Sequence, residues 1–507
     1  MRVFLLTALA LATAPAFAQG AVVRPCIGGI ADEDGNPSTT NNNYPCNGVD
    51  LYAHLPINTF ASPGSPAPTV DNSELWGWTD PETGKEYALV ALYNGTAFVD
   101  VSTPEAPVYL GKLPQPAGVS PSLWRTLRVY NNHVFVGSEA NSHGVQVFDL
   151  TQLRNVTTPP ITFAQSARYT GVGRTHTLEI NTATGFMYLA GTNTCSGGLH
   201  IVNVQNPVTP VQAGCFSADG YTHEAQCLVY DGPDADHAGK EICAAYNEDH
   251  VAFVDVTNKA NPTLISRGFY PNTGYTHQGW FTDDRRHILL DDEFDPANPG
   301  TRTIVMSVAD LDAPTFDFNY FGPLPTAAHN LYIRGNHAFL SNYRGGLRVL
   351  DISGIDANTF TEVAFFDTYP ASNTFGYAGS WMNYPFFGGG LVVVTDGANG
   401  LFLLRVPQLV TGNEPEEVPA ETFALTLTGP NPFAGTSALT LSVGEAQAVR
   451  AEVFDALGRR VAVLHDGPLA AGAHRLTLDG AALPAGVYVV RVTGETGTAT
   501  QTVSLTR

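Results

Sequence analysis

A short apolar segment that ends near a polar residue recurs along the chain, and this repeat constrains the fold more than any other feature. The seven copies end at or beside the following residues: Asp100, Asp149, Asn203, Asp255, Ser307, Asp351 and Arg405. Successive copies lie 49, 54, 52, 52, 44 and 54 residues apart. A solenoid would also give a fixed period, but its repeats are typically shorter or helical, so the spacing favours propeller blades.

Each copy is interpreted as the third of four strands in its repeat. Two strands precede it, as in WRTLRVY and HVFVGSEA before the second copy, and a proline-containing turn and a further strand follow most copies. The 50 glycines and 35 prolines, with only 14% charged residues, favour turns and strands over long helices. The sequence therefore predicts an all-β fold whose main part is a seven-bladed β-propeller.

The segment Val49 to Ile57 indicates how the ring closes. It resembles the fourth strand of the first full repeat, yet it precedes that repeat. We expect it to be the missing outer strand of the last blade, whose third strand ends near Arg405. The predicted propeller spans residues 49–406 and follows an N-terminal segment at 19–48.

The first 18 residues have the pattern of a signal peptide. One basic residue, Arg2, precedes an apolar run, and Ala16-Phe17-Ala18 forms a small-x-small cleavage site. No later segment offers about 18 uninterrupted apolar residues, so no membrane span is expected. A net charge of −22 argues against nucleic acid or an anionic membrane as a partner bound by charge.

Two resemblances add an expected location. The repeats resemble the LVIVD type, and YTHEAQC, EICAAYNED, YTHQGWFTDD and ILLDDEFD together resemble the choice-of-anchor B family. This resemblance covers roughly residues 45 to 406. It implies a propeller displayed at the cell surface, and it states neither a reaction nor a ligand.

The chain changes character after residue 406. Residues 407–423 are polar and proline-rich, which indicates a linker. Residues 424–507 show alternating strands and predict a small β-sandwich. Asn431-Pro432-Phe433, VFDALGRRVAVL and LPAGVYVVRV, in this order, resemble the C-terminal sorting domain of type IX secretion. That resemblance implies the type IX machinery as a partner, and surface attachment or release; the alternative is an ordinary accessory sandwich.

The start of each inner strand carries a polar side chain at an aligned position. The seven positions are Glu74, Arg125, His176, His223, His277, His329 and Ser380, spaced by 51, 51, 47, 54, 52 and 51 residues. Because inner strands line the channel of a propeller, we expect these side chains to meet around one axis. Four of the 14 histidines occupy this position in four consecutive blades.

Polar residues at the ends of the second strands return to the same rim. Those taken as ligands or supporting groups are Glu139, Glu248, Asp292, Glu293, Asn342 and Asp396, together with Glu74 and Arg125 of the ring. Imidazoles backed by carboxylates and amides are typical of metal centres. The four histidines are therefore predicted to bind a transition metal such as Zn, Fe or Cu.

Other interpretations of the histidine ring remain open. The pocket could hold an anion or another polar ligand, which Arg125 would favour, or the histidines could be structural caps repeated by duplication. The acidic run Asp291 to Asp295 lacks the EF-hand spacing and is interpreted as a solvated turn, with Ca²⁺ binding as the alternative. Two functions follow: a surface binding or scaffold protein with an unknown ligand, or a metal-dependent enzyme, an oxidoreductase or hydrolase, that uses the four axial histidines.

Export makes the six cysteines candidates for disulfides. If His223 lies opposite Asn247 in an antiparallel hairpin, Cys227 lies directly opposite Cys243, with Cα atoms about 4.5 to 5.5 Å apart. The other local pairs are Cys195 with Cys215 and Cys26 with Cys46. The alternative for Cys227 and Cys243 is a pair of buried free thiols.

Overall fold

The structure of the protein, a computed structural model, falls into two compact units, Met1–Leu409 and Val410–Arg507. The described residues of the first unit are 23–32, 43–61, 71–295 and 299–409. Those of the second are 424–427, 433, 435–443, 447–455, 459–469, 472–481, 483–494 and 498–506. The predicted signal peptide and most of the predicted linker lie outside these ranges.

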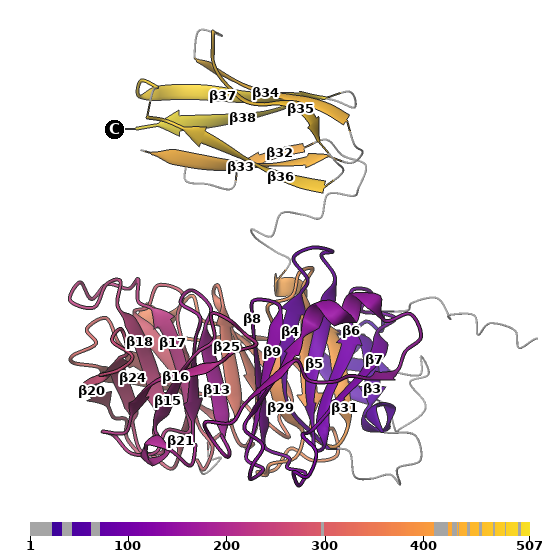
Figure 1. Cartoon of the computed structure of the whole chain (residues 1–507), viewed down its shortest axis with the longest axis vertical. Helices are drawn as coiled ribbons and strands as arrows, with labels where there is room; N and C mark the ends of the chain where they lie inside the picture. Colours follow the sequence, from indigo (N-terminus) through magenta and orange to yellow (C-terminus); the bar gives the residue numbers. More distant parts are fainter. Residues whose placement is uncertain are drawn as a thin grey trace, which may run out of the picture. The chain divides into compact units, whose positions relative to one another are not determined.

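The described part of the first unit forms seven antiparallel sheets, the blades of a propeller (Figure 1). The strands of each blade are given from the inner to the outer one. Blade one is β4 (Asn72–Thr79), β5 (Glu86–Leu92), β6 (Gly95–Asp100) and β7 (Val108–Pro114), and blade two is β8 (Arg125–Tyr130), β9 (His133–Ser138), β10 (Val145–Asp149) and β12 (Ala167–Tyr169). Blade three is β13 (Thr177–Asn181), β14 (Phe186–Ala190), β15 (Leu199–Asn203) and β16 (Val211–Phe216), and blade four is β17 (Glu224–Val229), β18 (Glu241–Tyr246), β19 (Val251–Asp255) and β20 (Thr263–Gly268). Blade five is β21 (Thr276–Phe281), β22 (His287–Asp292), β23 (Arg302–Ser307) and β24 (Thr315–Phe321). Blade six is β25 (Asn330–Arg334), β26 (His337–Ser341), β27 (Leu347–Asp351) and β28 (Thr361–Phe366). Blade seven is β29 (Ser380–Tyr384), β30 (Leu391–Asp396), β31 (Gly400–Arg405) and β3 (Asp50–Pro56).

Short additional elements extend two of the blades. β11 (Ile161–Thr162) pairs with β7 in parallel, while β2 (Asn43–Asn47) and β1 (Ile30–Asp32) continue the sixth blade beyond β28. The 3₁₀ helices are η1 (Ile57–Phe60), η2 (Leu150–Asn155), η3 (Cys195–Gly197), η4 (Ile355–Ala357) and η5 (Pro407–Leu409). No helix among the described residues is long and apolar enough to cross a membrane.

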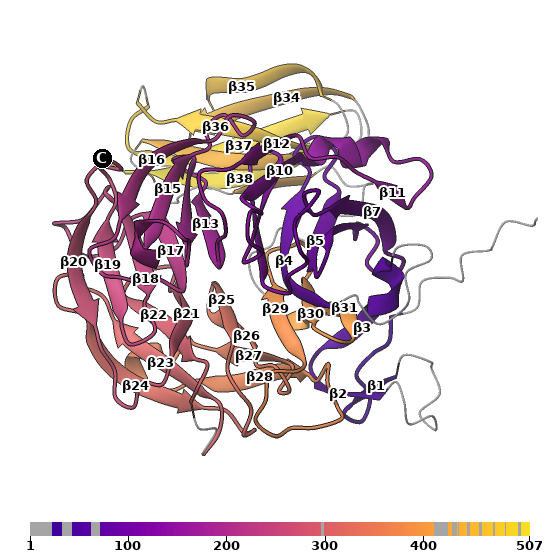
Figure 2. The same ribbon diagram turned by 60° about the horizontal axis from the view of Figure 1, so that its bottom comes forward.

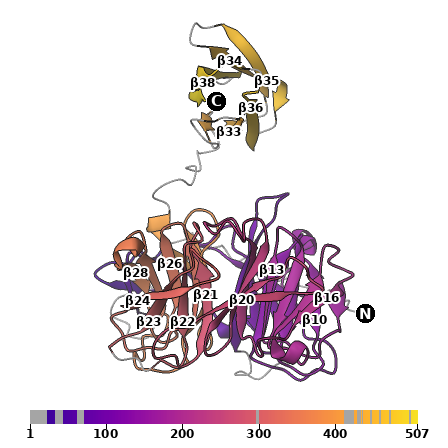
Figure 3. The same cartoon turned by 90° about the vertical axis from the view of Figure 1, so that its left-hand side faces the viewer.

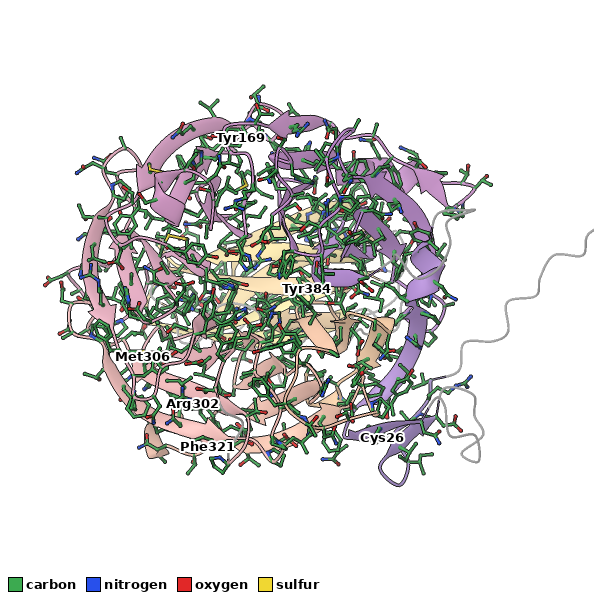
Figure 4. The ribbon with its side chains drawn as sticks, turned by 90° about the horizontal axis from the view of Figure 1, so that it is seen from below. Cys26, Tyr169, Arg302, Met306, Phe321 and Tyr384 are labelled. Atoms are coloured by element: carbon green, nitrogen blue, oxygen red, sulfur yellow. A yellow bond between two sulfur atoms is a disulfide. The ribbon has the colours of Figure 1, made fainter. Side chains whose placement is uncertain are left out.

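The inner strands close into a ring, which Figure 2 shows around its axis and Figure 3 shows edge-on. Each inner strand contacts the next, and β29 of the last blade contacts β4 of the first. The seventh blade takes its outer strand from β3, which pairs antiparallel with β31. The predicted closure is therefore confirmed. In Figure 4, Tyr384 of inner strand β29 lies near the centre, and Phe321 of outer strand β24 lies at the periphery.

The repeated aspartate has a structural role at the end of the third strand. Oδ1 of Asp100, Asp149, Asp255 and Asp351 accepts a hydrogen bond from the backbone N–H two residues later, at 2.9–3.1 Å. Oδ1 of Asn203 does the same at 2.9 Å. A side chain that bonds the backbone in this way forms an Asx turn, which ends the strand and starts the next loop. The repeat is thus a folding signal, and its aspartates do not belong to the site.

The second strands are buried on both faces because each blade packs between two others. In β5 every residue from Tyr87 to Leu92 is buried, and β18 is buried throughout. Such strands appear in sequence as continuous apolar runs and not as alternating ones. The core is consequently divided into clusters between neighbouring blades, such as the one shared by Phe98 of blade one and Phe148 of blade two.

Three disulfides join the six cysteines. Cys227 and Cys243 are direct cross-strand partners in β17 and β18, with Cα atoms 4.0 Å apart, closer than the predicted spacing. This pairing confirms the register inferred from sequence. Cys195–Cys215 and Cys26–Cys46 are also bonded, and the latter ties the segment before β1 to β2.

The second unit is a β-sandwich, with its two layers visible in Figure 1. One sheet contains β32 (Ala424–Leu427), β33 (Thr436–Val443) and β36 (Gly472–Asp479). The other contains β35 (Arg460–Leu469), β34 (Gln447–Asp455), β37 (Gly486–Gly494) and β38 (Thr498–Leu505). Leu439, Leu441, Val453 and Val490 are buried in the core between them. The all-β prediction, a propeller followed by a small sandwich, is confirmed.

Candidate metal and ligand site

Six of the seven aligned positions line one cavity among the starts of the inner strands. The cavity, together with open solvent at its mouth, encloses about 390 Å³. Its lining residues are Glu74, Trp124, Arg125, His176, His223, Glu224, His277, Glu293, His329, Asn330, Tyr343 and Trp381. At the seventh position, Ser380 is fully buried and the neighbouring Trp381 faces the cavity in its place.

The four histidines form a continuous arc along one side of the cavity. Successive ring centroids lie 4.1 Å apart from His176 to His223, 4.5 Å from His223 to His277, and 4.6 Å from His277 to His329. Each ring comes from a different blade, so the spacing of the blades sets the spacing of the imidazoles. The predicted convergence of these side chains is present in the structure.

Three of the four imidazoles are oriented through Nδ1. His176 Nδ1 lies 2.6 Å from Glu139 Oε1, His277 Nδ1 lies 3.0 Å from Asp291 Oδ1, and His329 Nδ1 lies 2.5 Å from the Trp381 carbonyl oxygen. A carbonyl oxygen can only accept, so His329 Nδ1 donates and its Nε2 keeps a lone pair. An acceptor behind Nδ1 is how proteins fix the tautomer of a metal-binding histidine. In contrast, the buried Nδ1 of His223 has no hydrogen-bond partner among the described residues.

The ligand atoms gather into two groups that share His277. One comprises His223, Glu224 and His277, and the other comprises His277, Glu293 and His329; within each, the ligand atoms lie within 4.8 Å of one another. His176 belongs to neither group of described residues. The structure thus assembles two histidines with one carboxylate, where the sequence predicted four histidines around one ion.

Burial favours the neutral form of His277 and His329. It lowers the pKa of His277 and of His329 to about 3, helped by the neighbouring imidazoles His176 and His277 respectively. A neutral imidazole is the form that binds a metal. His2Glu donors of this kind hold zinc in enzymes, and two histidines with one carboxylate also hold non-haem iron.

A buried charge network lies next to the cavity. Arg128 Nε donates to Glu179 Oε2 at 2.8 Å, and Arg128 Nη1 approaches Glu74 Oε2 at 3.5 Å. Its guanidinium also stacks 4.1 Å above the Trp76 ring. Burial raises the pKa of Glu74, and burial together with Glu74 raises the pKa of Glu224 well above its usual value. Glu224 can therefore carry a proton inside the cavity.

Five of the predicted supporting residues do not line this cavity. Glu139 lies outside the lining but contacts His176 Nδ1. Asp292 is buried and accepts backbone N–H bonds from Gly274 and Tyr275 at 2.6 and 2.7 Å, while Asp396 accepts from the loop that follows it. Asn342 lines a separate small cavity, and Glu248 forms a backbone bridge with Thr276. The carboxylates of Asp292 and Asp396 thus bond loop backbone, and that role is not visible in the sequence.

The sequence interpretation missed Glu224, Tyr343 and Asp291. Glu224 directly follows His223, and this adjacency was the available signal. Tyr343 donates to Glu293 Oε1 at 2.6 Å and so holds that carboxylate in place. Asp291 was assigned to a solvated acidic turn, which is wrong, because it and Asp292 lie at the buried end of β22.

Comparisons with known proteins identify two segments. Residues 430–505 match the secretion system C-terminal sorting domain, and residues 326–356, within the sixth repeat, match the LVIVD repeat. The sorting domain indicates export across the outer membrane to the cell surface or extracellular space, and hence interaction with the type IX machinery. A comparison with curated proteins finds no match.

Solved structures show distant similarity. PorZ, a surface component of the type IX secretion system of Porphyromonas gingivalis, is 13% identical with a TM-score of 0.44 over 87% of this chain, which spans 60% of PorZ. A protein from Lactobacillus plantarum is 12% identical, with a TM-score of 0.43, over 81% of this chain and 100% of its own. The C-terminal WD40 domain of Sif2 is 9% identical, with a TM-score of 0.43, over 68% and 98%. The assignment of the blades therefore rests on the strand pairing given above.

Proposed function

We propose that this protein is an extracellular binding propeller whose cavity holds a transition metal on His277, His329 and Glu293. The observation that carries the proposal is that an outer partner fixes each of these ligands: Asp291 behind His277, the Trp381 carbonyl behind His329, and Tyr343 on Glu293. We assign the ion to this group and not to the His223 group, because His223 Nδ1 lacks such a partner within the described part of the chain.

The donor set supports Zn or Fe(II) more than Mg or Ca, since two of three ligands are imidazoles. Three protein ligands leave coordination positions open for a further ligand. A bound metal would supply a Lewis acid that attracts an anionic or carbonyl oxygen. The residues of the chain hold that ion, and the cavity mouth admits the ligand.

Metal analysis of the secreted protein tests the proposal. We expect about one equivalent of zinc or iron after dialysis, and its loss in His277→Gln. His176→Gln is the matched control, because His176 lines the same cavity and belongs to neither ligand group. Equal metal loss in both variants, or none bound to the native protein, would contradict the assignment.

A metal-dependent enzyme at the same site, an oxidoreductase or hydrolase, is the second candidate. The raised pKa of Glu224 favours it, because a buried carboxyl whose protonated form is stabilised can act as a general acid beside the metal. An activity that requires metal and is abolished in Glu224→Gln, with metal content unchanged, would support the enzyme.

We also propose that the propeller, residues 49–406, belongs to the choice-of-anchor B family and is joined by a linker at 407–423 to a sorting domain at 424–507. The LVIVD match in the sixth repeat and the sorting-domain match support this division. Deletion of 424–507 should leave the propeller in the periplasm. Surface localisation of the truncated chain, checked by protease accessibility on intact cells, would contradict the sorting role.

A further inference from the structure

Arg125 is a buried cation without a partner in the described structure. Its side chain lines the cavity, the residue is 1% exposed, and Nε, Nη1 and Nη2 are all buried without a hydrogen bond. Other buried arginines are paired: Arg128 contacts Glu179, and Arg302 contacts Asp295. This lack of a partner distinguishes Arg125 from Arg128 and Arg302.

The energetic cost of this arrangement supports that interpretation. A buried charge without a counter-charge destabilises a fold, and proteins normally pair or neutralise it. Burial lowers the pKa of Arg125 only to about 10, so the guanidinium stays charged at neutral pH. A residue that lowers the stability of the fold in this way is expected to be retained where function requires it.

The second observation is a group of exposed aromatic rings around the cavity mouth. We call Trp124, Phe294, Phe375 and Tyr377 the aromatic rim; they are 40% to 51% exposed. Trp124 lines the cavity, and the Tyr377 ring lies 5.4 Å from that of Tyr343, which also lines it. Phe294 and Phe375 lie 6.3 and 5.5 Å from Tyr377. Exposed aromatic rings beside a pocket are typical of surfaces that bind a ligand.

We propose that the cavity binds a small organic monocarboxylate that carries a ring, with the carboxylate on Arg125 and the ring on the aromatic rim. The planar guanidinium presents paired N–H donors that match the two oxygens of a carboxylate. The proposal names the ligand class for the binding function proposed above, and it does not require the metal.

The lining residues favour a single negative charge over a phosphate. Arg125 is the one arginine or lysine among them, whereas Glu74, Glu224 and Glu293 are acidic. A doubly charged phosphate would face these carboxyl groups with only one fixed cation to balance it. A monocarboxylate is balanced by Arg125 alone.

Thermal melting and calorimetry of the full chain in EDTA test the proposal without metal. The probes are benzoate, acetate, benzyl alcohol and inorganic phosphate. We expect benzoate to raise the melting temperature and to bind more tightly than acetate, which lacks the ring. Benzyl alcohol, which lacks the charge, and phosphate should have little effect. Equal effects of phosphate and benzoate would overturn the assignment to carboxylates.

Two variants separate ligand binding from a structural role. Arg125→Met should raise the melting temperature of the ligand-free protein, because it removes an unpaired buried charge, and should weaken benzoate binding about 10- to 100-fold. Arg405→Met, on a half-buried arginine of the seventh blade that pairs with Asp50 and lies outside the cavity lining, is the matched control and should change neither. A lower melting temperature in Arg125→Met, or unchanged benzoate binding, would overturn the proposal. Because metal is absent throughout, failure here leaves the metal assignment to its own test.

Discussion

The pH dependence of metal affinity provides the sharpest test of the site. Two ordinary histidines with a pKa near 6.5 are about 90% protonated at pH 5.5, and each proton must leave before the metal binds. Between pH 7 and pH 5.5, such a pair loses about 70-fold in affinity through proton competition alone. His277 and His329 have a pKa of about 3 in the folded protein, so neither binds a proton in this range. We therefore expect their contribution to zinc affinity to change by less than about two-fold.

The assay is a competition titration of zinc against a chromogenic chelator, calibrated at pH 7, 6 and 5.5. An unstructured peptide with two histidines is the control and should lose affinity steeply. Circular dichroism at each pH confirms that the fold persists. A loss of 50-fold or more for the protein would refute the reasoning, because it would mean that the imidazoles are hydrated and protonate normally.

Three further outcomes concern stability. Arg154 donates to both carboxylate oxygens of Asp80, which lowers the pKa of Asp80 to about 2. Asp80→Asn should lower the free energy of unfolding by about 1 kcal/mol at pH 7, as measured by urea denaturation. This loss should shrink as the pH falls from 4 towards 2, because the carboxylate that Arg154 stabilises is then protonated in the native protein as well. Replacing Cys227 and Cys243 by serine opens a loop with a sequence separation of 16 residues, and should cost on the order of 3 kcal/mol by the same assay; no cost would contradict the bond. Asp255→Ala, which removes an Asx turn, should cost about 1 kcal/mol.

The architecture could be predicted because each blade ends its third strand with the same local device. The Asx turn at Asp100 or Asp351 needs an aspartate at a fixed place after an apolar strand, so it leaves a periodic mark in the sequence. The ring of inner-strand positions follows from that period, since equal spacing returns the chain to the same place in each blade. The pairing of Cys227 with Cys243 could be predicted for a similar reason. In a regular antiparallel hairpin, one known pair of opposite residues fixes all the other pairs by counting along the two strands.

The supporting groups could not be assigned in this way because the register is irregular near the cavity. In blade five the pairing shifts between Thr276 and Gln278, so His277 has no cross-strand partner and its Nδ1 meets Asp291. The same kind of shift follows Ser380 in the seventh blade. A β-bulge re-aims side chains without changing the residue pattern, so the choice between Asp291 and Asp292 is not visible in the sequence.

The differences among the seven aligned positions explain how a repeated fold acquires a directional site. Duplication places every first-strand side chain at the same rim, so identical blades would give a symmetric ring. Here four adjacent blades supply imidazoles, and the second blade supplies Arg125, a cation without a hydrogen-bond partner among the described residues. In the binding mode proposed above without metal, the anionic end of a ligand would point towards Arg125. Burial of the Arg125 charge lowers the stability of the fold. The pairing of β3 with β31 and the Cys227–Cys243 disulfide stabilise the ring elsewhere, and their residues do not line the cavity.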